Sequence, residues 1–128
     1  MTALQRDATM GFIHIPVSVK APGRSPDHYE ALFLIDTGAI DSMAPSDELR
    51  RAGLEPVGQK TYELADGTLH EYQFGIAQIE FMGEITAGRV IVGPEGVEPF
   101  LGVTALEAAG VSIDPSTQTL KKLPAVRI

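Results

Sequence analysis

The stretch Leu32–Ala39, which reads LFLIDTGA, carries the strongest structural signal in the sequence. Its four leading apolar residues are typical of a buried strand, which we expect to span residues 30–35. The run ends at Asp36, and the three residues that follow it are all small. A carboxylate at the end of a buried strand costs free energy unless it is hydrogen-bonded or functional. Asp36 therefore either accepts backbone hydrogen bonds in a turn that ends the strand, or belongs to a functional site.

Short apolar or alternating segments, separated by turn signals, fill most of the remaining chain. Pro16 favours an edge position for the first of these segments. Ser46 and Thr104 are expected to cap two short helices at their N-terminal ends, and Gly53 and Gly110 to end them. The expected strands lie at 11–20, 61–65, 68–72, 75–81, 85–92, 111–113 and 120–128, and the expected helices at 46–52 and 104–109.

An Asp-Gly pair, Asp66-Gly67, separates two segments in which apolar and polar residues alternate. Such a pair between alternating segments is a strong signal for a β-hairpin with a two-residue loop. We therefore predict a hairpin at residues 62–72.

Length and composition are those of a single-domain globular protein. The 128 residues fit one domain, expected at 11–128 after a loosely ordered arm at 1–10. The net charge of −7 disfavours nucleic-acid and anionic-membrane partners. No segment has the features of a signal peptide or a membrane-spanning helix, so a cytoplasmic location is expected. The sequence has no cysteine, and His14, His28 and His70 match no metal-ligand spacing, so no metal site is expected.

In order and spacing, the segment from Phe12 to Ile113 resembles the retropepsin-like aspartic proteases, whose best-known members are the retroviral proteases. The resemblance is carried by Leu34–Ala39 (LIDTGA), by Ala65–Thr68 (ADGT) in the predicted hairpin, and by Phe100–Gly102 (FLG) with the helix after it. It implies an all-β fold, a closed retropepsin-like β-barrel with one or two short helices. It also implies a hydrolase, an aspartic endopeptidase acting on a peptide or protein substrate without a metal or organic cofactor.

The resemblance gives Asp36 the catalytic role. Aspartic-protease chemistry needs two carboxyl groups that share one proton, so that one activates a water molecule and the other polarises the substrate carbonyl. The sequence contains no second Asp-Thr-Gly or Asp-Ser-Gly. A catalytic form must therefore be a two-fold homodimer, in which each subunit contributes one Asp36.

The same resemblance assigns roles to the neighbouring residues. Thr37 would hydrogen-bond across the dimer axis, Gly38 would allow close approach of substrate and partner, and Ala39 would border the cleft. The hairpin at 62–72 would be a flap that closes over the bound peptide, and Phe100–Gly102 would support the catalytic loop from behind. The flap residues expected to contact substrate are Ala65, Asp66, Gly67 and Thr68.

Two positions depart from the retroviral pattern. Ile40 replaces an aspartate that helps retroviral members to bind substrate backbone, and Val103 replaces a basic residue that serves their dimer. These departures suggest a cellular, bacterial-type relative. Asp41 is expected to bond to its own loop rather than to face the cleft.

A rival interpretation keeps the fold without the catalysis. The chain would then be a non-catalytic peptide-binding or dimerisation module. The intact Asp-Thr-Gly triplet favours the enzyme, because a binding module gains nothing from two repelling buried carboxylates. A third possibility is a resting monomer that dimerises only when concentrated or bound to substrate.

Overall fold

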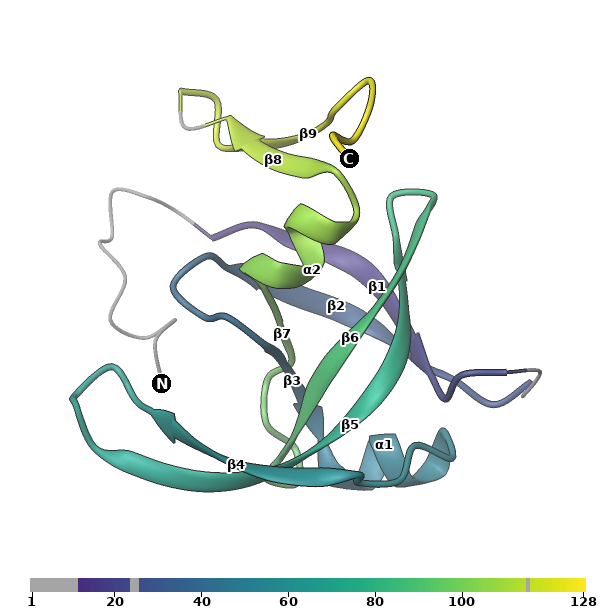
Figure 1. The fold of residues 1–128 in the computed structure, drawn as a ribbon, viewed down its shortest axis with the longest axis vertical. Helices are drawn as coiled ribbons and strands as arrows, with labels where there is room; N and C mark the ends of the chain where they lie inside the picture. The colour runs from purple at the N-terminus through teal and green to yellow at the C-terminus, as the bar shows by residue number, and fades with distance from the viewer. Residues whose placement is uncertain (1–11, 24–25, 115) are drawn as a thin grey trace.

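The computed structural model describes residues 12–23, 26–114 and 116–128, so the expected arm at 1–10 lies outside it. Within these ranges the chain is mostly β-structure, with a closed six-stranded barrel and two short helices (Figure 1). The predicted fold class is confirmed at this level. The strands are β1 (His14–Lys20), β2 (Tyr29–Asp36), β3 (Ser42–Pro45), β4 (Gly58–Glu63), β5 (Leu69–Phe81), β6 (Glu84–Gly93), β7 (Phe100–Gly102), β8 (Val111–Asp114) and β9 (Thr119–Lys122), and the helices are α1 (Ser46–Arg51) and α2 (Val103–Ala108).

The barrel closes through pairing between β1 and β5. Its order is β1-β2-β7-β3-β6-β5, and β5 returns to β1 over Ser18–Lys20. Pro16 lies outside this short pairing and meets only β2, so its missing N–H breaks no second ladder. Pro16 therefore lies at a sheet edge, as predicted. The C-terminal end of β1, residues 18–20, instead lies between β2 and β5. Strand β4 continues the sheet beyond the barrel as the partner of β5.

The wall formed by β7, β3 and the C-terminal halves of β2 and β6 is buried on both faces. Successive side chains of a strand point to opposite faces, so each of these strands contributes to both sides. On the inner face lie the barrel-core residues Phe33, Ile35, Ala44, Val90 and Leu101. On the other face lies a second apolar group, here called the outer cluster, made of Leu34, Met43, Ile91 and Phe100. Burial of both faces explains why the end of β2 reads as an unbroken apolar run.

The predicted hairpin at 62–72 is present, as the connection of β4 to β5. Its loop has three residues rather than the expected two. The Leu64 N–H donates to the Thr68 carbonyl at 2.8 Å, and the Gly67 N–H donates to the Leu64 carbonyl at 2.9 Å. Gly67 has a φ of +87° while Asp66 does not have a positive φ, as in a type I turn followed by a left-handed glycine.

Strand β5 runs without a break through both of the strands predicted at 68–72 and 75–81. A two-residue loop does occur, but at Met82-Gly83 between β5 and β6, where the φ values are 53° and 76°. The last predicted strand, at 120–128, is shorter than expected, since β9 ends at Lys122. Across the described ranges, no helix is long and apolar enough to cross a membrane.

Helix α1 ends as predicted but begins differently. Gly53 follows the helix with a φ of +78°, the conformation expected of a glycine that ends a helix. Pro45 occupies the N-cap position, and no side chain caps the helix there. The prediction that Ser46 is the N-cap is therefore wrong, because Ser46 is already the first helical residue.

Helix α2 is capped by backbone carbonyl groups of the loop that follows β2. The Val103 N–H donates to the Ala39 carbonyl at 2.8 Å, and the Thr104 N–H donates to the Ile40 carbonyl at 3.2 Å. These bonds satisfy two N–H groups that a helix start otherwise leaves unpaired. The predicted capping role of Thr104 is wrong, since Gly102 is the N-cap and no side chain caps the helix.

Gly102 brings β7 into close contact with the back of this loop. A Cβ at Gly102 would lie 2.6 Å from the carbonyl oxygens of both Ile40 and Asp41. The Gly102 N–H donates to the Ser42 hydroxyl oxygen at 3.0 Å. Only glycine allows this spacing, because the atoms in the way belong to the backbone.

We expect Gly102→Ala to lower the free energy of unfolding by about 2 kcal/mol, because the loop has to move to admit the methyl group. Gly88→Ala is the matched control, since a Cβ at Gly88 in β6 would meet nothing within 4 Å. Its effect should be within about 0.5 kcal/mol. Urea unfolding measures both variants, and equal stabilities would contradict the close contact at Gly102.

Candidate functional site

Asp36 is the last residue of β2 and is fully buried, with an exposed fraction of 0%. Its Oδ1 accepts a hydrogen bond from the Gly38 N–H at 3.0 Å, and its carbonyl oxygen accepts one from the Ala39 N–H at 3.1 Å. These bonds fold the Asp-Thr-Gly triplet into a tight turn. Strand alternation places the Asp36 side chain on the same face as Leu34, which belongs to the outer cluster.

A cleft of about 500 Å³ opens between this turn and the β4–β5 hairpin. In Figure 1 the β2–β3 loop and the hairpin tip both lie on the left side of the barrel. Three of the four outer-cluster residues form the floor of the cleft. The lining includes Met43, Ile91 and Phe100 from that cluster, residues 38–41 from the loop, residues 60–65 and Tyr72 from the hairpin, and Arg89, Pro94 and Val97.

The loop residues predicted for the site lie at or beside this cleft. Gly38 and Ala39 line it, and Thr37 is exposed. Asp36 is not part of the lining surface but lies directly behind Gly38. A Cβ at Gly38 would lie 3.3 Å from Asp36 Oδ1, so the Gly38 backbone packs closely against the carboxyl group.

The predicted flap residues are divided between the cleft and the hairpin tip. Ala65 lines the cleft, whereas Asp66, Gly67 and Thr68 are exposed and do not line it. Asp66 Oδ1 accepts hydrogen bonds from the Thr68 hydroxyl at 2.7 Å and from the Thr68 N–H at 3.0 Å. These bonds favour the ionised carboxylate and lower the pKa of Asp66. The two hydrogen bonds also order the tip of the hairpin.

Three residues at the cleft, Asp41, Tyr62 and Arg89, form a polar network that the sequence motifs did not predict. The Asp41 side chain is 5% exposed, and its Oδ2 accepts a hydrogen bond from the Tyr62 hydroxyl at 2.8 Å. The same oxygen lies 3.0 Å from Arg89 Nε. The expectation that Asp41 bonds to its own loop is therefore wrong. Its carboxylate instead joins the loop to β4 and to β6.

Aromatic side chains cover the cleft-facing side of the hairpin. The ring centroids of Tyr62 and Tyr72 lie 6.2 Å apart, and those of His70 and Tyr72 lie 4.3 Å apart. The Arg89 guanidinium group lies 5.3 Å from the centroid of the Phe74 ring, within range of a cation–π interaction. His70 is exposed.

Tyr62 is held in its protonated, hydrogen-bond-donating form. Burial raises its pKa well above the ordinary value of 10.0, and the hydrogen bond to Asp41 with the negative charge of that carboxylate raises it further. The positive charge of Arg89 offsets part of this increase. The Tyr62 hydroxyl therefore remains a donor to Asp41 throughout the physiological pH range.

One feature of the sequence signals this network. Arg89 interrupts an apolar segment predicted as a strand at 85–92, and a charge in such a segment indicates a buried partner. The identity of that partner depends on how β6 meets the loop, which no local pattern encodes. Among the residues that the structure describes, no group of three or more His, Cys, Asp or Glu side chains is arranged to hold a metal ion.

We expect Arg89→Gln to lower the free energy of unfolding by about 2 kcal/mol, because it leaves the Asp41 carboxylate without a cation. The cost is below that of a fully buried pair, since the Arg89 side chain is 37% exposed. Chemical denaturation, followed by far-ultraviolet circular dichroism, measures this change.

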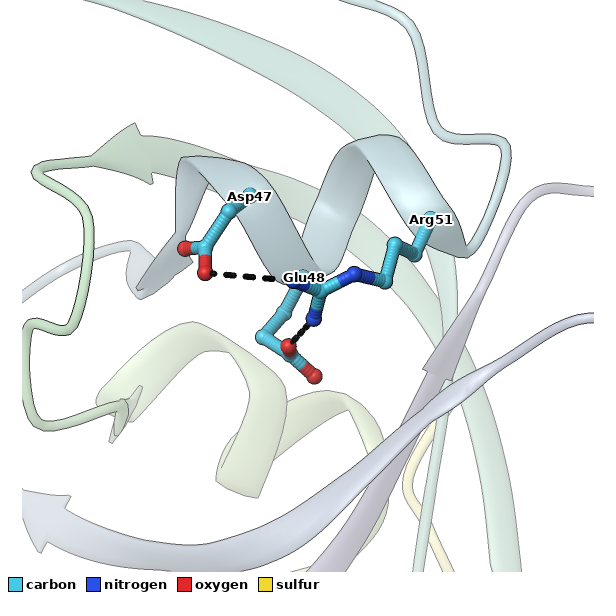
Figure 2. Close-up of polar contacts among 3 residues, drawn as sticks. All are labelled: Asp47, Glu48 and Arg51. Atoms are coloured by element: carbon cyan, nitrogen blue, oxygen red, sulfur yellow. Dashed lines mark hydrogen bonds and ion pairs between the residues drawn. The ribbon is translucent and has the colours of Figure 1, made fainter.

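Arg51→Gln is the matched control. Arg51 pairs with Asp47 at 3.9 Å and with Glu48 on the surface of α1 (Figure 2), and its side chain is 69% exposed. Its loss should cost about 0.5 kcal/mol or less. If the two variants were equally stable, the Asp41–Arg89 pair would be no more than a surface contact.

Comparison with protein-family models found no match, and a search of curated proteins found no relative either. Function is therefore inferred from the geometry of the chain. The chain has a buried aspartate in a tight Asp-Thr-Gly turn, an apolar cleft beside that turn, and a hairpin that lines one side of the cleft.

Proposed function

We propose that the chain is a retropepsin-like aspartic endopeptidase that acts as a homodimer and uses Asp36 from each subunit. The observation that carries this proposal is the position of the Asp-Thr-Gly turn, beside an apolar cleft of about 500 Å³ that the β4–β5 hairpin borders. Three further features agree with the sequence resemblance to the retropepsin-like proteases. They are the closed barrel, the loop that Gly102 supports, and the β4–β5 hairpin.

In the proposed mechanism, the two Asp36 carboxyl groups meet at the dimer axis and share one proton. The ionised group takes a proton from a water molecule, and the resulting hydroxide attacks the carbonyl carbon of the scissile peptide bond. The protonated group donates a hydrogen bond to the carbonyl oxygen as negative charge develops there. Proton transfer to the leaving nitrogen then breaks the C–N bond and gives a carboxylic acid and an amine.

The burial of Asp36 defines how the reaction centre has to be approached. Gly38 covers Asp36 Oδ1 with backbone alone, so this side of the turn is the proposed path for substrate and for the partner subunit. Thr37 is exposed beside it and is available for the proposed hydrogen bond across the axis. A buried site also strengthens the electrostatic coupling of the two carboxyl groups, because water no longer screens them.

The proposed substrate is an extended peptide lying between loop and hairpin. An extended chain can pair with exposed backbone groups of a strand edge, and β4 ends the sheet order. The apolar floor of Met43, Ile91 and Phe100 would receive an apolar side chain of that peptide.

A non-catalytic peptide-binding or dimerisation module is the second candidate. It is favoured by one observation, the burial of Asp36 together with its hydrogen bond from the Gly38 N–H, which is also how an aspartate stabilises a turn. Such a module would bind peptide in the same cleft and leave it intact.

Peptide cleavage between about pH 3 and 7 distinguishes the two candidates. We expect the wild-type chain to cleave a peptide library and Asp36→Asn to lose activity by about 10²–10⁴-fold or more, because the amide cannot exchange the shared proton. Asp47→Asn, on α1, controls for the loss of a carboxylate elsewhere. Binding of intact peptide by both wild type and Asp36→Asn, without cleavage, would establish the module instead.

The shared active site makes a separate prediction about mixtures. A large excess of inactive Asp36→Asn chains should suppress wild-type activity, because most wild-type chains then pair with a variant that lacks the second carboxyl group. Specific activity should also fall on dilution, in parallel with the dimer population seen by analytical ultracentrifugation. Activity per wild-type chain that is unchanged by the variant would rule out a dyad formed between subunits.

A further inference from the structure

One carboxylate oxygen links the β4–β5 hairpin to the barrel through side chains, in addition to the continuous strand β5. Asp41 Oδ2 accepts the Tyr62 hydroxyl at 2.8 Å and faces Arg89 Nε at 3.0 Å. Tyr62 belongs to the hairpin, Asp41 to the loop after Asp36, and Arg89 to β6 of the barrel wall. The network therefore connects a projecting element to two parts of the barrel.

A second contact reinforces the same base. The Arg89 guanidinium group lies over the Phe74 ring, and that ring covers Gly58 on the opposite strand. A Cβ at Gly58 would lie 2.6 Å from Phe74 Cζ, so only glycine allows the ring to lie there. The Phe74 ring of β5 thus contacts Arg89 of the barrel wall and lies against Gly58 of β4.

The hairpin tip is stabilised differently. Residues 65–69 are all exposed, and their bonds close within the loop, from Thr68 to Asp66 and between Leu64 and Thr68. These bonds give the tip its shape. They do not tie it to the barrel.

We infer that Asp41 is a positioning residue, which fixes the base of the hairpin (residues 58–62 and 70–74) over the cleft through Tyr62 and leaves the tip (residues 63–69) as the part that moves. Tyr62 and His70, which are paired across the two strands, mark the boundary between the fixed base and the moving tip. Arg89 makes this possible, because its charge compensates a carboxylate that is otherwise almost fully buried. The consequence for catalysis rests on the proposed function, whereas the anchoring itself does not.

Hydrogen exchange of the hairpin amides tests the anchoring. In wild type we expect slow exchange at the base and fast exchange at the tip. In Tyr62→Phe, which removes one hydroxyl and keeps the ring contact with Tyr72, base amides should exchange about tenfold faster, as expected for the loss of a hydrogen bond to a charged group. Tyr72→Phe is the matched control, on the neighbouring strand and the same face, and should exchange like wild type.

Two results would overturn the inference. Unchanged exchange in Tyr62→Phe would mean that the bond to Asp41 does not restrain the hairpin. Equal acceleration in Tyr72→Phe would mean that loss of any tyrosine hydroxyl on this face loosens it.

A second variant examines Asp41 directly. Asp41→Asn removes the charge that contributes to the raised pKa of Tyr62, so tyrosine ionisation followed by ultraviolet absorbance should shift to lower pH. Its base amides should also exchange faster than those of wild type. An unchanged titration would show that Asp41 does not hold the Tyr62 hydroxyl in solution.

These measurements need no substrate, so they separate this inference from the proposed function. A chain that cleaves no peptide can still show the anchored base, and an active protease can lack it. If the chain is active, Tyr62→Phe should raise KM more than it lowers kcat, because a loosened hairpin weakens substrate binding without changing the reacting carboxyl groups.

Discussion

The site depends on the close approach of β7 to the back of the loop that follows Asp36. Gly102 makes this approach possible, because a side chain there would overlap the carbonyl oxygens of Ile40 and Asp41. The same loop offers its Ala39 and Ile40 carbonyl groups to the first N–H groups of α2. Strand, loop and helix therefore hold one another in place behind the Asp-Thr-Gly turn, which is folded by the hydrogen bonds that Asp36 accepts from Gly38 and Ala39.

The supported loop forms one side of the cleft and meets the hairpin. Because β7 lies between β2 and β3, the loop that joins those two strands is held at both of its ends. Its first part presents Gly38 and Ala39 to the cleft, and its last residue, Asp41, receives Tyr62 and Arg89. Asp36 and the short loop after it thus carry the proposed reactive group and an attachment point of the hairpin.

Local signals in the sequence were sufficient for the features that local backbone chemistry determines. The Asp66-Gly67 pair identified the hairpin, and Gly53 and Gly110 marked the ends of the helices, where both have a positive φ. The run at the end of β2 correctly indicated a buried strand.

Features that depend on distant contacts were not predictable in this way. Ser46 and Thr104 have the right chemistry to cap a helix, but for α2 the carbonyl groups of residues 39 and 40 take that role. The hairpin loop has three residues rather than the predicted two, because the Leu64 N–H pairs with the Thr68 carbonyl. The partners of Asp41 come from other strands, 21 residues away in the case of Tyr62. Asp41, Tyr62 and Arg89 come together only in the folded barrel.

The separation of the barrel core from the outer cluster has a consequence for how such a protein can evolve. The inner face of the wall carries Phe33, Ile35 and Leu101, and the opposite face carries Met43, Ile91 and Phe100 beneath the cleft. Mutations on the cleft face can reshape what the cleft accepts while the residues that close the barrel stay the same. The face beneath the cleft can therefore change in sequence while the barrel core is kept.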